Sequence, residues 1–185
     1  MIQTLLKRLP LFLTVFIGQI VADQWTKQLA TAYLKGQPAK TWLGDSIRLQ
    51  YATNEGAFLS LGAQLPPQAR YWVLTIGVGL LLLGLSYYAL TNVKVDQLQV
   101  GSYALIASGG FSNWVDRARF EGSVVDFMNL GVGNSPYLRT GVFNVADIAI
   151  LVGIGILFVQ SYREEKKKKA AEAAAKAGGQ QAPQS

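Results

Sequence analysis

Two aspartates lie in segments where a charged side chain is costly. Asp126 is part of the apolar run Val124-Val125-Asp126-Phe127-Met128, and Asp147 lies at the start of a long segment with no other charge. An ionisable group near hydrocarbon costs about 2.5 to 3.5 kcal/mol on insertion scales, so such acids usually line a pathway or a reaction centre. Two acids on converging segments predict a shared site.

The residue types that are missing restrict the chemistry of this site. The chain has no cysteine and no histidine, which excludes thiol nucleophiles, disulfides and Ser-His-Asp arrangements, and we expect no metal and no cofactor. Peptide hydrolysis would most simply use two carboxylates and a water. One ionised carboxylate accepts a proton from the water, while its protonated partner polarises the scissile carbonyl. Like charges about 3 Å apart do not both ionise cheaply, so the pair would share one proton.

Polar residues at helical spacing could support the two acids. Asn144 and Asp147 have the i, i+3 spacing of a helix N-cap with an acid in the first turn. Asn113 and Asp116 would share a helix face, and Arg117 could pair with a carboxylate. Each group also has a purely structural interpretation, as a helix cap or a network at a helix end.

Two further groups have the same ambiguity. Asp23 and Lys27 have i, i+4 spacing; we favour a surface ion pair for Lys27 and a role in the site for Asp23. Asn54 could donate to a substrate carbonyl or simply satisfy its own loop, and taken alone the loop is favoured. Gly56, two residues later, permits a tight turn or the close approach of another backbone.

The elements that must position these residues are membrane helices. Of the 185 residues, 50% are hydrophobic and 15% charged, against about 25% charged in soluble domains, and the mean hydropathy is positive. Lys7-Arg8 and the apolar residues after them resemble a signal peptide, but no small-x-small cleavage site follows, so a first span is favoured. Each crossing needs about 20 mainly apolar residues. The four candidates are Leu9–Ala22 extended past Asp23, Tyr71–Leu90, Leu98–Val115, which Gly109-Gly110 shortens, and Gly141–Tyr162.

The charges predict an orientation. Four spans place both termini on one side, and Lys7-Arg8, Lys94 and the basic cluster from Arg163 to Lys169 mark that side as cytoplasmic. Within that cluster, Lys166-Lys167-Lys168-Lys169 supplies four charges toward the formal net charge of +6, so a membrane flank explains the positive balance better than a nucleic-acid partner does. Five basic residues would then fall outside: Lys27, Lys35, Lys40, Arg48 and Arg70. The orientation therefore depends mainly on the carboxyl-terminal lysines. The acids and asparagines of the site would all lie toward the outer face.

The remaining segments predict a sheet and a tail. Ser46 to Tyr51 alternates polar with apolar residues, which indicates a half-buried strand in a small sheet between the first and second spans. Pro66-Pro67 is suited to the start of the second span. We therefore expect an all-α membrane protein of four transmembrane helices with a small extracytoplasmic sheet. Residues 1–162 would form one membrane-embedded domain, and residues 163–185 a basic cytoplasmic tail whose Glu-Ala-Ala-Ala-Lys run prolongs a helix before a disordered end.

The ordered set of motifs resembles the lipoprotein signal peptidase family, also called signal peptidase II, from about Pro10 to Tyr162. The motifs are Ala22-Asp23-Gln24-x-x-Lys27, Asn54-x-Gly56-Ala57-Phe58, Gly109-Gly110-x-x-Asn113-x-x-Asp116-Arg117, Val124-Val125-Asp126-Phe127 and Phe143-Asn144-x-Ala146-Asp147. The resemblance implies a bacterial inner-membrane aspartyl protease. Such an enzyme removes the signal peptide of a prolipoprotein by cleaving just before its diacylglyceryl-modified cysteine.

The resemblance also implies roles for individual residues. Asp126 and Asp147 are the catalytic pair, with Asp116 as the rival of Asp126. The supporting and substrate-binding residues are Asp23, Asn54, Gly56, Asn113, Asp116, Arg117 and Asn144. The implied partners are lipid-modified prolipoproteins and membrane lipids, with no nucleic acid, and globomycin would be an inhibitor.

Three residues depart from the family pattern close to the site. Glu55 replaces a small or hydroxyl residue, Ser112 stands where glycine is frequent, and Ile148 replaces a frequent serine. Glu55 adds an acid and puts the substrate preference in doubt.

Two other classes of protein also fit acids near a membrane. A proton-coupled transporter subunit could use Asp23, Asp126 and Asp147 as a relay. A noncatalytic scaffold would need the aspartates only for stability.

Overall fold

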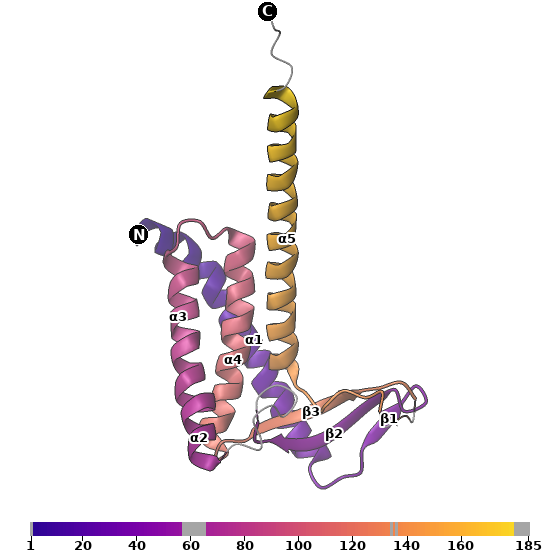
Figure 1. The fold of residues 1–185 in the computed structure, drawn as a ribbon. Coiled ribbons are helices and arrows are strands. Elements are labelled where there is room, and N and C mark those ends of the chain that lie inside the picture. The colour runs from indigo at the N-terminus through magenta and orange to yellow at the C-terminus, as the bar shows by residue number, and fades with distance from the viewer. Residues whose placement is uncertain (1, 57–65, 134, 136, 180–185) are drawn as a thin grey trace, which may run out of the picture.

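The structure is a computed structural model that describes residues 2–56, 66–133, 135 and 137–179. Figure 1 shows long helices side by side, with a small sheet projecting from one end of the bundle. In chain order the elements are α1 (Ile2–Leu34), β1 (Lys40–Trp42), β2 (Ile47–Asn54), α2 (Pro67–Tyr71), the π-helix η2 (Trp72–Gly77), α3 (Val78–Thr91), α4 (Gln97–Arg119), β3 (Val124–Leu130) and α5 (Val145–Gly179).

Three helices are long and apolar enough to cross a membrane. They are Ile2–Leu34, the continuous run Gln68–Thr91 through α2, η2 and α3, and Val145–Glu172. Pro67 occupies the first turn of α2, as the sequence predicts, because a helix start needs no donor at that position. These helices correspond to three of the four predicted spans.

The remaining expected span, Leu98–Val115, lies within α4, which is less apolar than the other three helices. Asp96 starts α4 through a reciprocal capping box with Gln99. The helix contacts α1, α3 and α5, and its buried face contains polar side chains: Ser102, Ser108, Ser112, Asn113, Asp116 and Arg117. These polar groups lower the hydropathy of α4, so a hydropathy window does not find it. The neighbouring helices cover the same groups in the folded protein.

Glycines let the other helices approach α4 closely. A Cβ at Gly109 would lie 2.5 Å from the carbonyl oxygen of Ala146 on α5, and one at Gly110 would lie 2.6 Å from Leu82 on α3. Gly153 of α5 packs in the same way against Ser102 and Ile106. The sequence suggested that Gly109-Gly110 shortens this helix, but α4 continues through both glycines. They allow the close contact that small residues give in membrane helix pairs.

The sheet differs from the prediction in one strand. It is antiparallel with the order β1-β2-β3. Only β1 and β2 come from the chain between the first two membrane helices; β3 follows α4 and contains Asp126. Ala52 of β2 pairs with Asp126, beyond a register shift that follows Leu49. The sheet therefore joins the loop after α1 to the segment with the first aspartate.

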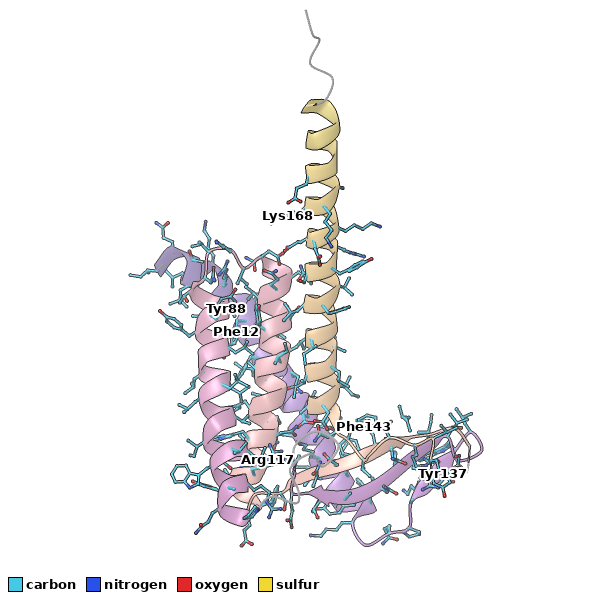
Figure 2. All side chains as sticks on the ribbon, viewed as in Figure 1. Phe12, Tyr88, Arg117, Tyr137, Phe143 and Lys168 are labelled. Carbon is cyan, nitrogen blue, oxygen red and sulfur yellow. The ribbon has the colours of Figure 1, made fainter. Side chains whose placement is uncertain are left out.

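Two apolar clusters hold the ends of the bundle. One cluster lies at the end away from the sheet and includes Phe12, Ala89, Val95 and Val100. In the other cluster, at the sheet end, Phe127 packs with the end of α1. Figure 2 shows Phe12 and Tyr88 at the first end and Phe143 where the sheet meets α5.

Arg8 is buried at the end of the bundle away from the sheet. Its guanidinium donates to the carbonyl oxygens of Ala89 and Asn92, at 3.1 and 2.6 Å, and to that of Val95. It thus satisfies carbonyls at the end of α3, which otherwise have no helical partner. A charge that the sequence presents as a membrane flank therefore belongs to the folded bundle.

The amino-terminal segment and the extension of α5 lie at the same end of the bundle, opposite the sheet (Figure 1). α5 continues past the last apolar residues through Lys166-Lys167-Lys168-Lys169 to Gly179. The helix therefore includes the Glu-Ala-Ala-Ala-Lys run, as expected. The expected disorder of the last residues, 180–185, lies outside the described part of the chain.

Candidate active site

Asp126 and Asp147 meet around one asparagine. The side-chain amide of Asn144 donates to Asp126 Oδ1 at 2.6 Å, and the backbone N–H of Asn144 donates to Asp147 Oδ2 at 3.1 Å. All three residues are buried. A strand and the first turn of a helix, 21 positions apart, thus bring the two carboxylates to one point, as the shared-site hypothesis predicts.

The local sequence explains why α5 begins here. Asn144 Oδ1 accepts from the backbone N–H of Asp147 at 2.9 Å, and Asp147 Oδ2 in turn accepts from the backbone N–H of Asn144. This reciprocal cap satisfies two donors at the helix start. The capping arrangement that the i, i+3 spacing indicates is confirmed. It also fixes Asp147 at the end of a membrane helix, where its carboxylate faces the helix dipole.

A second asparagine holds Asp126 from the other side. Asn54 Nδ2 donates to Asp126 Oδ2 at 3.0 Å, and its Oδ1 accepts from the backbone N–H of Gly56 at 2.9 Å. Burial raises the pKa of Asp126 to about 7; the hydrogen bond from Asn54 opposes this change, and the nearby charge of Asp147 adds to it. Asn54 therefore accepts a backbone hydrogen bond within its own loop and donates to the carboxylate of Asp126 at the same time.

Asn113 connects the two acids to the interior of the bundle. Its Nδ2 donates to Asp147 Oδ1 at 3.0 Å, while its Oδ1 accepts from Asn144 Nδ2 at 3.0 Å and from Lys27 Nζ at 2.8 Å. Because two donors face Oδ1, the amide has one favourable orientation, with its NH₂ toward Asp147.

Lys27 is the centre of a buried polar network. Its ammonium lies 2.8 Å from each of Asp23 Oδ2, Asp116 Oδ2 and Asn113 Oδ1, and the residue is only 3% exposed. The surface ion pair expected for Lys27 is therefore wrong, because α4 covers this face of α1. The three donors of the ammonium match three acceptors, as a buried cation requires.

Asp23 joins three helices. Its Oδ1 accepts from the backbone N–H of Ala146 in the first turn of α5 at 2.7 Å, and its Oδ2 accepts from Ser112 of α4 at 2.7 Å. Asp23 thereby satisfies a free donor at the start of the helix that contains Asp147. Ser112, one of the departures from the family pattern, is part of this connection.

Asp116 and Arg117 have different surroundings from the central acids. Asp116 accepts from Gln24 Nε2 at 2.8 Å and from the backbone N–H of Val125 at 3.2 Å, in addition to Lys27. Arg117 donates to the backbone carbonyl of Gly56 at 2.7 Å. Within the described residues, no carboxylate pairs with Arg117. Figure 2 places it at the end of α4 that lies near the sheet.

The other two departures are exposed residues. Glu55 pairs with Arg70, 2.8 Å away, and is exposed. Ile148 is also exposed, on a membrane helix.

Two adjacent cavities share part of their lining, and Arg117 lines one of them. One, of about 440 Å³, is lined by residues that include Arg70, Arg117 and Glu121; the other, of about 360 Å³, has an almost wholly apolar lining that includes Leu80, Leu83 and Phe111. Thr75, Ile76 and Trp114 line both cavities. Among the described residues, no group of three or more Asp, Glu, His or Cys side chains could hold a metal ion.

The sequence analysis did not predict that Lys27, Gln24 and Ser112 contact the buried acids of the site. The i, i+4 spacing of Asp23 and Lys27 at the end of an apolar segment was the available signal. An ion pair within a membrane helix is costly unless another element covers it. Here α4 provides that cover.

The fold and the site together define a polytopic membrane protein with a buried carboxylate pair at one end of its helices. Comparison with known proteins gives the family. The family described as Signal peptidase (SPase) II matches residues 15–163. The chain belongs to this family, the lipoprotein signal peptidases, and is therefore a protease.

Individual relatives agree with this assignment. The lipoprotein signal peptidase of Halalkalibacterium halodurans is 32% identical over 146 residues, which cover 79% of this chain and 88% of the relative. Those of Geobacter sulfurreducens and Actinobacillus succinogenes are 32% and 34% identical, over 84% and 82% of this chain and 93% and 90% of theirs. A solved bacterial membrane enzyme has the same fold, with a TM-score of 0.69 at 19% identity, over 85% of this chain and 90% of that one.

Proposed function

We propose that this protein is an aspartyl endopeptidase that removes signal peptides from prolipoproteins whose cysteine is diacylglyceryl-modified. Asp126 and Asp147 form the catalytic pair. The observation that supports this assignment most strongly is the contact of both carboxylates with Asn144, within a buried set of amide donors. Asp116 is the weaker candidate, because it forms an ion pair with the ammonium of Lys27 and, within the described residues, no asparagine connects it directly to Asp126 or Asp147.

The reaction follows from one proton shared between two buried acids. The ionised carboxylate accepts a proton from a water molecule, and the resulting hydroxide attacks the scissile carbonyl. The protonated partner donates a hydrogen bond to the carbonyl oxygen and stabilises its developing negative charge. The proton taken from the water then passes to the nitrogen of the leaving amine as the C–N bond of the peptide breaks. Asn54, Asn113 and Asn144 hold the acids in place through both protonation states, because amides do not titrate in this range.

The position of the pair suits a lipidated substrate. We infer that α4 is the fourth membrane-spanning helix, that both termini are cytoplasmic, and that the site faces the outer side of the bacterial inner membrane. A lipid-modified substrate then diffuses laterally to the enzyme. The apolar cavity beside Phe111 fits an acyl chain, and the neighbouring cavity beside Arg117 fits polar groups close to the cleavage site.

The test is cleavage by the purified protein of one prolipoprotein in two forms, with and without the diacylglyceryl group. We expect cleavage of the lipidated form, with the modified cysteine as the new amino terminus in mass spectrometry, and strong inhibition by globomycin. Cleavage at another bond, or equal cleavage of both forms, would refute the proposed specificity. Proton flux in vesicles without any proteolysis would instead support the transporter that uses Asp23, Asp126 and Asp147.

A further inference from the structure

Large apolar side chains gather at the far end of the sheet. Five of them are exposed: Trp42, Leu43, Val132, Tyr137 and Leu138, which we call the sheet tip. Leu43 is 76% exposed and Tyr137 is 93% exposed. Single exposed apolar residues are common, but a group of five at the end of β1 and in two adjacent loops marks an interaction surface.

Hydrogen bonds hold the two loops of the sheet tip together. Arg139 pairs with Asp45 at 3.1 Å and donates to the carbonyl oxygen of Gly133 at 2.9 Å. The backbone N–H of Gly133 in turn donates to Ser46 Oγ at 3.2 Å, and that of Val132 donates to the carbonyl oxygen of Leu138 at 2.9 Å. The exposure of the apolar side chains is therefore a property of an ordered structure.

The register of the sheet gives it one apolar face. Trp42, Ile47 and Leu130 pair across the three strands, so their side chains share a face. The next row pairs Thr41, Arg48 and Asn129, and these polar side chains lie on the opposite face.

The apolar face continues from the helices. Leu49 and Met128, on the same face as Trp42, pack against the buried cluster that contains Leu34 at the end of α1, and so does Val145 at the start of α5. Lys40, which pairs with Leu49, is an exposed charged residue on this face. One face thus runs from buried contacts at the ends of two membrane helices to exposed apolar residues at the sheet tip.

Position and charge indicate what covers this surface. Figure 1 shows the sheet extending sideways from the bundle, with its far end at nearly the same height along the helix axis as the start of α5. β1 begins six positions after α1 ends, and α5 begins 15 positions after β3 ends, so short connections hold the sheet at this height. Asp45 pairs with both Arg48 and Arg139, so these three residues next to the apolar side chains leave one net positive charge, which suits an anionic lipid headgroup.

We infer that the sheet tip inserts into the interfacial region of the phospholipid leaflet on the side of the two aspartates. Trp42 and Tyr137 are suited to the headgroup level, and Leu43, Val132 and Leu138 to the adjoining acyl region. The lipid anchor holds the sheet, and with it Asp126 on β3, at a fixed depth. This inference does not depend on the chemistry of the aspartate pair.

The absence of native cysteine allows a direct test. Leu43→Cys and Leu138→Cys are labelled with an environment-sensitive fluorophore in the full chain and reconstituted into phosphatidylethanolamine and phosphatidylglycerol vesicles. Thr41→Cys, exposed on the polar face, is the matched control, and melting temperatures equal to that of wild type confirm folding. We expect lipids with a quencher near the headgroup to quench positions 43 and 138 at least about twofold more strongly than position 41, and aqueous iodide to show the reverse order.

The opposite result would overturn the inference. Equal access of iodide to positions 41, 43 and 138, without extra quenching by the lipids, would show that the sheet tip lies in water. Energy transfer between labels on different molecules, with no lipid quenching, would show that a second copy of the chain covers it.

Discussion

At the scale of single residues, Asn144 determines how the two carboxylates meet. Its backbone N–H contacts Asp147 and its side-chain amide contacts Asp126, so one residue fixes both acids without adding a charge. A charged residue in this place would bias the pair toward one protonation state. The neutral amides leave that choice to burial and to the repulsion between the carboxylates.

The proton affinity of Asp126 predicts a pH dependence of stability. Burial raises its pKa from 3.8 to about 7. The folded protein therefore holds this proton more tightly than the unfolded chain, so the stability that it contributes is present at low pH and is lost as the pH rises from about 4 through 7. Asp126→Asn does not titrate. Across this interval we expect the melting temperature of the variant to rise relative to wild type, and a pH-independent difference would contradict the raised pKa.

The buried ammonium of Lys27 predicts a loss of stability when its charge is removed. Lys27→Met leaves Asp23 and Asp116 as two unpaired buried carboxylates, and breaking such a pair costs about 3 to 5 kcal/mol. We expect a large fall in melting temperature in detergent and partial recovery when Asp116→Asn is added. Lys94→Met, on the exposed turn before α4, is the control. Equal melting temperatures for the two single variants would show that the network contributes little.

At the scale of elements, the contact between α4 and α5 positions the second acid. Gly109→Ala would place a Cβ 2.5 Å from the carbonyl oxygen of Ala146, next to Asp147, so the start of α5 must move. We expect activity to fall at least about 10-fold, since small misplacements of reacting groups are costly. Gly101→Ala in the same helix meets no atom within 4 Å and should keep full activity. Similar activities of the two variants would refute this dependence on close packing.

The elements also show what could be predicted from the sequence. Pro67 and the Asn144 cap mark helix starts through local chemistry, and the alternation around Arg48 marks β2. The strand β3 lacks this signal, because Val124, Val125, Asp126 and Phe127 are all buried and no exposed face interrupts the run. The burial of Lys27 depends on which face of α1 meets α4, and a single sequence does not contain that information.

At the scale of the whole molecule, the charges support the proposed topology. The extension of α5, which contains Lys168, lies away from the sheet (Figure 2), and the buried Arg8 contacts the carbonyls at the end of α3. On the side that we propose to be the outer one, Arg48 and Arg70 pair with acids, and Lys27 is buried between two aspartates. The five basic residues that seemed to oppose the orientation therefore include three that are neutralised by partners.

This topology predicts the access of a membrane-impermeant thiol reagent. In intact spheroplasts we expect Glu121→Cys, in the turn after α4, to be labelled, and Lys168→Cys, on the extension of α5, to be labelled only after lysis. Each variant adds the only cysteine of the chain. Labelling of Lys168→Cys in intact spheroplasts would reverse the orientation and place the aspartates on the cytoplasmic side.

The central claim is that Asp126 and Asp147 together perform the hydrolysis. The most direct measurement is the cleavage rate of a purified diacylglyceryl-modified prolipoprotein by Asp126→Asn, Asp147→Asn and Asp116→Asn, each with its folding checked by thermal unfolding. We expect a loss of at least about 10³-fold for Asp126→Asn and Asp147→Asn. Asp116→Asn should keep measurable turnover in proportion to its folded fraction. Normal turnover by a folded Asp126→Asn or Asp147→Asn protein would contradict the assignment, and a greater loss in Asp116→Asn than in Asp126→Asn would transfer the catalytic role to Asp116.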